Sequence, residues 1–474
     1  MENNRDYILL YINGKKTKVR GDSVFLSLSD FLRYEKQLVG TKVVCAEGDC
    51  GSCSVVHGKF EDGELHYKVI NSCIKYMFQL DSTHIITIEG LKHKGCLNPI
   101  QESMIKNHGA QCGFCTPGFI VAMTGLFEEK DKLCVQDLKD GLNGNLCRCT
   151  GYEPIVKAGL EVDTNNLKRF AEMYISTEII KTLQEVADIP VLVETEEKKF
   201  FRPLDLKSAV EFKNTHDNLT VISGGTDVGL QMNKKIREHN SIMSTYGIRD
   251  FSTLKIENDN LIVGAKIKLS TLEQFIKDLY PSFYSILNVF GSPQIRNSGT
   301  LVGNIGNASP IGDSLPFLFV MNAELELTGL HGNRKVNIND FYKGYKKLDL
   351  AKDEMITNVH IPLLKESEKL KVYKISKRRD LDISIFTAGF LMSEKDGKIE
   401  NINIAFGGVG PVVIRLKETE AFLKDKPVNQ ETFKEAGKIA VTEIAPISDV
   451  RGSKDFRFQL AKNILKKFYF EISS

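Results

Sequence analysis

The sequence lacks long apolar runs, which excludes one class of protein at the start. No stretch approaches the roughly 20 apolar residues of a membrane-spanning helix, and the N-terminal stretch MENNRDYILLYING is polar, without the apolar centre of a signal peptide. An excess of one charge is also lacking, because 63 basic and 61 acidic residues leave a net charge of +2. That balance argues against nucleic acid as the main partner, which a basic face would favour. We therefore expect a cytoplasmic protein with no membrane and no nucleic-acid partner.

Familiar catalytic and nucleotide-binding signatures are missing as well. No G-x-G-x-x-G fingerprint occurs, so a Rossmann nucleotide site is disfavoured. The nine histidines form no H-x3-H or H-E-x2-H pattern, and there is no G-x-S-x-G nucleophile motif. We predict no catalytic side chain.

Cysteine is absent from most of the chain. All ten cysteines lie between Cys45 and Cys149, in a sequence of 474 residues that suffices for about three domains. The 42% apolar content is that of a globular protein with proper cores. In a reducing compartment, clustered thiols more often bind metal or react than form disulfides. The composition thus divides the chain into a cysteine-bearing front and a cysteine-free body.

The first cysteine group lies in CAEGDCGSC, which contains Cys45, Cys50 and Cys53, with Cys73 further on. The C-x4-C-x2-C spacing followed by a distant fourth cysteine is that of a plant-type ferredoxin [2Fe–2S] cluster. Glycines in the loop permit the tight bends that such a cluster requires. The preceding YILLYINGKKTKV predicts two strands joined at Asn13-Gly14. A structural zinc site is the alternative, but zinc sites usually show two C-x2-C knuckles.

The second group comprises Cys112 and Cys115 in QCGFC, and Cys147 and Cys149 in CRC. Each pair precedes a predicted helix, the first with Thr116 as its cap, and the positive ends of two helix dipoles favour a negatively charged cluster. Taken alone, this spacing fits zinc as well as iron. Beside a ferredoxin-type loop, a second redox cluster is favoured. The remaining Cys96 and Cys134 are interpreted as small buried or half-exposed side chains.

Two glycine-rich stretches stand out in the body. LTVISGGTDVGLQM is a predicted strand ending in glycines, which let backbone amides approach a phosphate, although a simple glycine turn is an alternative. FGSPQIRNSGTLVGNIGNASPIGDSLP is predicted to be a long loop, and such loops are usually functional or disordered. Further on, SIFTAGFLMS and IENINIAFGGV predict hairpin strands, and the tail predicts a helix with Leu460, Ile464, Leu465 and Phe468 on one face.

The segments KVVCAEGDCGSCSV, QCGFCTPGF and GNLCRCTGYEPI together resemble the iron–sulfur part of the xanthine dehydrogenase and aldehyde oxidase family of molybdenum hydroxylases. The resemblance implies two [2Fe–2S] clusters, and in the family the glutamine before the second knuckle, here Gln111, touches the molybdopterin. Relatives often have Glu-Gly where this chain has Val43-Val44, and we expect only a local packing change there. The implied ligands are Cys45, Cys50, Cys53 and Cys73 for the cluster nearer the flavin, and Cys112, Cys115, Cys147 and Cys149 for the cluster nearer the molybdenum.

The two glycine-rich stretches resemble the FAD domain of the same family, which is not a Rossmann fold. The resemblance implies that the first glycine-rich stretch contains the pyrophosphate loop and that Phe290 is the aromatic residue near the isoalloxazine. It also implies further FAD contacts later in the sequence. Lys377 to Asp382 resembles a loop that affects acceptor choice, with Leu381 where some relatives are acidic; a solvated charged turn is the alternative. The implied FAD contacts are Val221, Ile222, Ser223, Gly224, Gly225, Thr226, Asp227, Val228, Phe290, Thr300, Leu301, Val302, Gly303, Asn304, Asp313, Ile356 and Lys374.

The resemblance spans nearly the whole chain and implies a multidomain α+β fold. We expect a β-grasp ferredoxin-like domain at 1–88, a four-helix [2Fe–2S] domain at 89–163, a linker at 164–197, a two-part α+β FAD-binding domain at 198–366 and a C-terminal α+β flavoprotein domain at 367–474.

The family's large molybdopterin-binding portion has no counterpart in the sequence. The chain therefore resembles the electron-transfer subunit of the family's bacterial xanthine dehydrogenases, which convert xanthine, NAD⁺ and water to urate and NADH. The expected partners are a molybdopterin-binding large subunit, in a heterodimer that dimerises, and NAD; the expected cofactors are two [2Fe–2S] clusters and FAD. An aldehyde or another N-heterocycle as the substrate, and a zinc-binding scaffold protein, are the alternatives.

Overall fold

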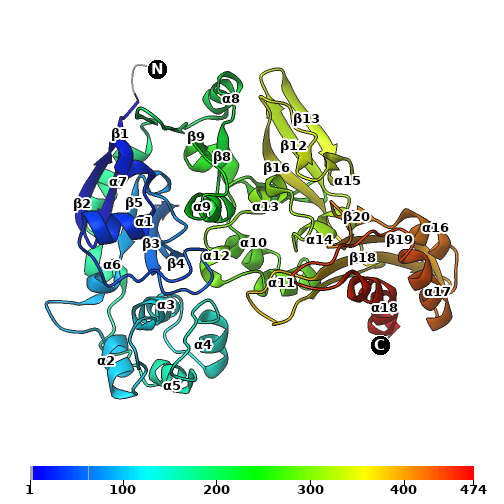
Figure 1. The fold of residues 1–474 in the computed structure, drawn as a ribbon, viewed down its shortest axis with the longest axis horizontal. Coiled ribbons are helices and arrows are strands. Elements are labelled where there is room, and N and C mark those ends of the chain that lie inside the picture. The colour runs from blue at the N-terminus through cyan, green and yellow to red at the C-terminus, as the bar shows by residue number, and fades with distance from the viewer. Residues whose placement is uncertain (1–3, 62, 474) are drawn as a thin grey trace. The chain divides into compact units, whose positions relative to one another are not determined.

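The computed structural model describes residues 4–61 and 63–473. They form two compact units, Met1–Arg249 with Gly291–Gly299, and Asp250–Phe290 with Thr300–Ser474. Figure 1 labels many of the helices and strands of both units. The short segment Gly291–Gly299 belongs to the first unit although the chain on either side of it belongs to the second.

The first unit begins with a five-stranded sheet in the order β2-β1-β5-β3-β4. Its first two strands form the predicted hairpin, with Asn13 and Gly14 at positive φ angles of 49° and 77°, as a tight two-residue turn requires. A parallel pairing then places β5 beside β1. The bounds are β1 (Tyr7–Ile12), β2 (Lys15–Arg20), β3 (Ser54–Glu61), β4 (Glu64–Asn71) and β5 (Thr83–Ile86).

Short helical turns surround this sheet. The Asp30 amide donates to Ser27 Oγ (3.1 Å), so Ser27 caps α1 (Leu28–Asp30), which continues as the π-helical η2 (Phe31–Glu35). The others are η1 (Gly21–Phe25), η3 (Met77–Gln79) and η4 (Ile88–Leu91).

Alternation along β1 gives the sheet two buried faces. Leu9 and Tyr11 contribute to a core shared with the following helices, whereas Ile8 and Leu10 contribute to a core on the other face. The second core also contains Phe200 and other residues of the β-strands that follow the iron–sulfur region. The sheet is therefore the middle layer of the first unit.

Four helices form the predicted helical domain, and Figure 1 shows them grouped together. They are α2 (Pro99–Lys106), α3 (Thr116–Glu129), α4 (Val135–Gly141) and α5 (Glu153–Leu160). One detail of the prediction is wrong: Cys115, not Thr116, occupies the N-cap of α3, and it makes no side-chain cap. Because Pro117 fits either of the first helical positions, the sequence does not distinguish these two starts.

The predicted linker is largely structured. It contains α6 (Phe170–Tyr174), α7 (Thr177–Ala187) and β6 (Val191–Glu194), which pairs with β7 (Lys199–Arg202). Ser176 caps α7 at 3.2 Å, which explains the helix start within a charged stretch. The small sheet β6-β7-β9-β8 is completed by β8 (Thr220–Ile222) and β9 (Ser241–Ser244), accompanied by α8 (Leu206–Thr215), α9 (Thr226–Asn233) and η5 (Thr245–Gly247).

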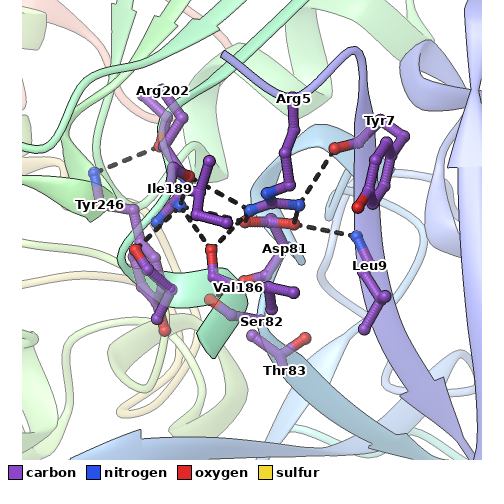
Figure 2. A network of polar contacts seen from close by, with 12 residues as sticks. Arg5, Tyr7, Leu9, Asp81, Ser82, Thr83, Val186, Ile189, Arg202 and Tyr246 are labelled. Carbon is purple, nitrogen blue, oxygen red and sulfur yellow. Dashed lines mark hydrogen bonds and ion pairs between the residues drawn. The ribbon is translucent and has the colours of Figure 1, made fainter. Parts of the chain in front are cut away.

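A buried ion network joins this small sheet and α7 to the first strand (Figure 2). Asp81 accepts two hydrogen bonds from the Arg5 guanidinium, at 2.9 and 2.7 Å, and lies 3.2 Å from Arg202. The arginines also donate to carbonyl oxygens at the end of α7, including that of Val186 at 2.7 Å from Arg5. Burial lowers the pKa of Arg202, and Asp81 opposes that shift. One carboxylate thus neutralises part of a doubly positive cluster.

The second unit contains two larger antiparallel sheets, in the orders β10-β11-β16-β12-β13 and β17-β18-β19-β20, and the pair β14-β15. The predicted hairpin is β18–β19, and Ile464, Leu465 and Phe468 of the predicted tail helix are buried. The strands are β10 (Leu254–Glu257), β11 (Asn260–Gly264), β12 (Glu324–Gly329), β13 (Gly332–Asn337), β14 (Tyr342–Gly344), β15 (Lys347–Leu348), β16 (Met355–Pro362), β17 (Glu368–Ile375), β18 (Phe386–Lys395), β19 (Lys398–Gly407) and β20 (Ile414–Arg415).

The long loop predicted around residues 290–316 contains two short helices and the start of a third, so that prediction is wrong for these parts. Ser292 Oγ caps one short helix at 3.2 Å and Thr300 Oγ1 caps the next at 3.0 Å, and these caps outweigh the glycines. The helices of residues 249–474 are η6 (Arg249–Ser252), α10 (Leu269–Phe275), α11 (Pro281–Asn288), α12 (Pro293–Arg296), α13 (Leu301–Asn307), α14 (Leu315–Val320), α15 (Ile338–Phe341), α16 (Lys417–Leu423), α17 (Gln430–Ala440) and α18 (Lys454–Ser473). Among the described residues, no helix combines the length and apolar character needed to cross a bilayer.

Candidate iron–sulfur and flavin sites

The first cysteine group lies in a loop that reverses direction repeatedly between η2 and β3. Ala46, Gly48 and Gly51 have positive φ angles of 55°, 78° and 68°, so the glycines predicted from the motif are needed for the bends. The Gly48 carbonyl is held by the Asn71 side chain at 2.7 Å. The cysteine of the next segment, Cys73, is 2% exposed and contacts the loop from inside the protein.

The four thiols of this group form a chain of contacts, because Cys45 contacts both Cys50 and Cys73, and Cys73 also contacts Cys53. A hydrogen bond with Cys50 lowers the pKa of Cys45, and the same contact raises the pKa of Cys50. The contact between Cys53 and Cys73 lowers the pKa of Cys53. The thiols are therefore hydrogen-bonded to one another through their protons. A metal centre that binds them as thiolates takes the place of these protons.

The departure at Val43-Val44 is a matter of packing. Val43 contacts the small apolar cluster of Cys53, Cys73 and Ile74, whereas Val44 is 61% exposed. The valine side chain extends the apolar surroundings of two thiols without displacing either of them.

The second cysteine group is assembled at the starts of α3 and α5. Cys149 donates to Cys112 at 3.7 Å, and Cys115 contacts Cys147. Burial raises the pKa of Cys115 to about 12. Burial also acts to raise the pKa of Cys147, but hydrogen bonding from Thr150, with its Oγ1 at 3.2 Å, lowers it overall.

The surface around this second group is open. Cys112 and Cys149 are exposed, and so is Gln111. Two aromatic side chains lie beside them in sequence, Phe114 at 47% and Tyr152 at 41% exposure. The Tyr152 hydroxyl accepts from the Cys147 amide at 3.0 Å, which fixes this ring near the thiols.

Each cysteine group contains the four thiols that a [2Fe–2S] cluster requires. Within the chain as described, no three Cys, His, Asp or Glu side chains converge as one metal ion requires. A [2Fe–2S] cluster instead divides four thiolates between two irons, two to each. Each group supplies that number of thiols, in mutual contact in the first group through Cys45 and Cys73, and as Cys112–Cys149 and Cys115–Cys147 in the second.

The two cysteine groups are joined by direct hydrogen bonds that the sequence motifs did not reveal. The Leu146 amide donates to the Cys50 carbonyl at 3.0 Å, and Asn145 donates to the Gly51 carbonyl at 3.0 Å. Asn145 in turn accepts from Gln294 at 2.8 Å, and Gln294 lies in the segment Gly291–Gly299. A Cβ on Gly51 would lie 2.3 Å from the Gly144 carbonyl oxygen, so the loops meet at their closest at this glycine.

The predicted pyrophosphate segment, residues 221–228, connects β8 to α9 in the first unit. Gly225 is the N-cap of α9 at a φ of 76° and makes no side-chain cap, so amides of the first turn lack that partner. A Cβ on Gly224 would lie 2.3 Å from the Ser298 carbonyl oxygen, and one on Gly225 would lie 2.5 Å from Gln79 Nε2. Gly224 is therefore required by close backbone approach and Gly225 by its positive φ, and the amides at a helix start suit an anionic group.

The other predicted flavin contacts lie in the second unit. The buried side chains of Asp313 and Lys374 are paired at 2.7 Å, and Lys374 also donates to the Val289 carbonyl, next to Phe290, at 3.3 Å. Asn304 Oδ1 accepts from Ser314 at 2.6 Å. These pairs bring Asp313, Lys374 and the backbone beside Phe290 together. The remaining predicted positions lie on α13, which carries Leu301, Val302, Gly303 and Asn304 after its cap Thr300, and on β16, which carries Ile356 and contacts α13.

The predicted acceptor loop, Lys377 to Asp382, lies between β17 and β18. In the loop, Arg378 donates to Asp382 at 2.7 Å and Leu381 has a φ of 68°, so the run is a turn closed by its own ion pair. Burial raises the pKa of Asp382 but Arg378 lowers it overall. Cys96 and Cys134 are both exposed, and the expectation of buried or half-exposed side chains is wrong, since neither lies on the apolar face of a helix or strand.

Three family descriptions match the chain in succession. Residues 87–160 match "[2Fe-2S] binding domain". Residues 195–364 match "FAD binding domain in molybdopterin dehydrogenase". Residues 371–472 match "CO dehydrogenase flavoprotein C-terminal domain". The predicted multidomain α+β fold, with iron–sulfur, FAD-binding and C-terminal flavoprotein domains, is confirmed by these matches.

Curated relatives cover the chain almost completely but are much longer. Xanthine dehydrogenase 1 of Arabidopsis thaliana is 30% identical, over 98% of this chain and 40% of the relative. Aldehyde oxidase 1 of Bos taurus is 28% identical, over 98% of this chain and 39% of the relative. The chain spans about two fifths of the length of the curated relatives it matches.

Solved structures share the fold of somewhat more than half of the chain. The Cu,Mo-CO dehydrogenase in its cyanide-inactivated form has a TM-score of 0.54 at 22% identity, covering 56% of this chain and 94% of that chain. Quinoline 2-oxidoreductase from Pseudomonas putida 86 has a TM-score of 0.53 at 21% identity, covering 57% of this chain and 94% of that chain. At these identities the likeness shows the fold.

Proposed function

We propose that the chain serves a molybdenum hydroxylase as its electron-transfer subunit, a proposal supported by its matches to a [2Fe–2S] binding domain, an FAD binding domain in molybdopterin dehydrogenase and a CO dehydrogenase flavoprotein C-terminal domain. The observation that supports the proposal most strongly is the junction of the two cysteine groups. The Leu146 amide, next to Cys147 in the sequence, donates to the carbonyl of Cys50. A path with one hydrogen bond therefore connects a ligand of one group to a ligand of the other.

In this proposal the chain's residues hold and insulate cofactors, and none acts as an acid or nucleophile. Two [2Fe–2S] clusters and FAD, when bound, supply one-electron and two-electron transfer between a molybdenum centre and a final acceptor. Cys45, Cys50, Cys53 and Cys73 hold one cluster, and Cys112, Cys115, Cys147 and Cys149 hold the other. The uncapped start of α9, in the first unit, binds the pyrophosphate.

The partner in this proposal is a molybdopterin-binding large subunit, in a heterodimer that dimerises. The exposed group of Cys112 and Cys149, with Phe114 and Tyr152 beside it, is the surface that faces this partner, and Gln111 contacts its molybdopterin. Aromatic side chains at a partly polar surface are typical of protein interfaces.

The proposed substrate is xanthine and the proposed acceptor is NAD. Similarity to xanthine dehydrogenases along 98% of the chain supports this choice. An aldehyde is the second candidate, because an aldehyde oxidase matches at nearly the same identity, 28%.

The first experiment is analysis of the purified chain. We expect about four iron and four acid-labile sulfide atoms and one FAD per chain, with a visible spectrum that bleaches on reduction by dithionite. A colourless protein containing zinc would contradict the proposal.

The second experiment uses the complex with whichever large chain co-purifies. Xanthine, an aldehyde and a quinoline are offered in turn, with NAD⁺ or oxygen as acceptor. We expect NADH formation with xanthine, and no turnover by the chain without its partner. Turnover of the aldehyde alone would select the second candidate.

A further inference from the structure

Helix α9 (Thr226–Asn233) has its two ends at two different candidate sites. Its first turn follows Gly224 and Gly225, the proposed pyrophosphate loop. Its last residue reaches the first cysteine group, where Asn233 Nδ2 donates to the carbonyls of Ala46, at 2.9 Å, and Cys73, at 2.8 Å. One amide group therefore holds the residue after Cys45 and the segment of the fourth cysteine together.

Asn233 is itself fixed from a second direction. The Tyr76 hydroxyl donates to Asn233 Oδ1 at 2.9 Å, so all three hydrogen bonds of this side chain bind parts of the first unit. The next residue adds a weaker, more exposed contact: Lys234 Nζ lies 2.8 Å from Glu47 and 3.4 Å from the Cys45 carbonyl.

The segment Cys73–Gln79 runs alongside α9 between the same two sites. At its cluster end, Cys73 accepts from Asn233, as described. In the middle, the Ile74 carbonyl lies so close to Gly229 that a Cβ there would be 2.2 Å away. At its other end, Gln79 Nε2 donates to the Gly224 carbonyl at 3.1 Å. The fourth cysteine and the pyrophosphate loop are thus tied to each other by two parallel connections, the helix and this segment.

We propose that binding of the flavin and retention of the first iron–sulfur cluster are coupled through these two connections, with Asn233 as the positioning residue. The inference rests on the cofactor positions of the proposed function. A pyrophosphate bound to the first-turn amides restricts the motion of Gly224 and the start of α9. Through the helix and the parallel segment, the motion of Asn233 and Cys73 is restricted as well. Because coupling between two binding sites is reciprocal, the loaded cluster also strengthens flavin binding.

Iron loss in the presence of a chelator measures this coupling. Full-length protein with its FAD, and the same protein after the FAD is removed, are incubated with excess chelator, and bleaching of the cluster absorbance is followed. We expect removal of the FAD to accelerate loss of one cluster by about tenfold, within the usual range of coupling between sites, while the second cluster is unaffected. The reciprocal measurement titrates FAD into iron-loaded and iron-free protein, and we expect a similar ratio of dissociation constants.

Variants distinguish the contribution of Asn233 to this coupling from that of its neighbours. Asn233→Ala removes the bonds to Ala46 and Cys73, so we expect the effect of FAD on iron loss to fall below about twofold. Tyr76→Phe removes only the hydroxyl that orients Asn233 and should reduce the effect partially, which keeps the test open if Asn233→Ala does not fold. The matched control is Lys235→Asn, which alters an exposed side chain two residues further on and keeps a residue suited to its φ of 52°.

The outcomes are distinguishable from a failure of the proposed function. Protein that holds neither iron nor FAD contradicts the proposed function itself. Protein that holds both, but loses iron at one rate with or without FAD, overturns the coupling alone. Full coupling in both Asn233→Ala and Tyr76→Phe overturns the role of Asn233.

Discussion

The two cysteine groups contain the same number of thiols but are built in opposite ways. In the first, Cys53 and Cys73 are each 2% exposed, and side chains from distant segments, such as Asn71 and Asn233, bind the loop carbonyls. In the second, Cys112 and Cys149 are exposed and the contacts come from neighbouring residues, such as Thr150 and Tyr152. Two thiols of the first group, Cys53 and Cys73, belong to the core while Cys45 and Cys50 are half-buried, whereas the second group lies at the starts of two helices.

This difference in exposure indicates which other groups each cysteine group is accessible to. In the first group, burial keeps water from the sulfurs of Cys53 and Cys73. An exposed group flanked by aromatic side chains is accessible to another protein. Stability should therefore depend strongly on the surroundings of the first group and weakly on those of the second.

The largest expected effect on stability comes from the buried ion network beside the five-stranded sheet that precedes and follows the first cysteine group. Asp81→Asn leaves Arg5 and Arg202 buried without their carboxylate, and we expect a loss of about 3–5 kcal/mol in the free energy of unfolding. The matched control in the helical domain is Asp131→Asn, whose pair with Arg169 is at the surface, with Asp131 94% exposed. It should cost less than about 1 kcal/mol. Urea unfolding of both variants compares them, and equal losses would contradict the buried-versus-exposed distinction.

The second effect is a pH dependence of the same sheet. His84 accepts from the Gly14 amide at 3.1 Å and pairs with the Tyr67 hydroxyl at 3.0 Å; burial lowers the pKa of His84 to about 4. The unfolded chain, with an ordinary histidine pKa near 6.5, binds this proton more readily, so stability falls as the pH drops from about 6.5 to 4, by up to about 3 kcal/mol.

Measurement of this effect needs a variant that keeps an acceptor. His84→Gln retains a group for the Gly14 amide but cannot be protonated in this range. We expect its free energy of unfolding to fall less than that of the original protein between about pH 7 and 4.5. An identical slope in both proteins would mean that His84 is not the sensor.

A smaller effect is expected where the two groups meet. Gly51→Ala adds a Cβ 2.3 Å from the Gly144 carbonyl oxygen at a φ of 68°, and we expect a loss of about 2–3 kcal/mol with weaker magnetic interaction between the two reduced clusters. Gly21→Ala is the control, because its φ of 56° is equally unusual but its Cβ would meet nothing within 4 Å. It should cost about 1 kcal/mol and leave the electron paramagnetic resonance spectrum unchanged.

The smallest expected effect on stability belongs to the second group. In iron-free protein, Cys112→Ser should change the free energy of unfolding by less than about 0.5 kcal/mol, because the side chain is exposed, whereas buried Cys73→Ser should cost about 1–3 kcal/mol. Each variant should still lose one of the two clusters by iron analysis, and the exposed Cys134→Ser should lose none. A large loss of stability in Cys112→Ser would remove the contrast between the groups.

Local patterns in the sequence predicted the parts of the fold that depend on neighbours along the chain. The hairpin at Asn13-Gly14 and the helix beginning near Pro117 follow from turn and helix-start rules, and the cysteine spacing identified both groups. The predicted domain limits, and the roles of the individual site residues, stay predictions.

Interactions between distant segments were not predictable in this way. Asn233, Asn145 and Gln294 are ordinary polar residues in sequence, and their importance arises from contacts with segments far from them in the chain. The glycine-rich stretch was misjudged for a related reason. Its glycine content suggested a loop, but Thr300 supplies a cap that starts a helix there.

The segment Gly291–Gly299 leaves its chain neighbours and joins the first unit, where Asn297 binds the Val69 carbonyl at 2.9 Å and Gln294 binds Asn145. No single break in the polypeptide can therefore release both units whole. A gene split between residues 249 and 250 would leave this segment on the wrong product, exposing polar groups that now bind one another. Fission or recombination of the gene at this boundary is consequently disfavoured, even though it is the most obvious border in the fold.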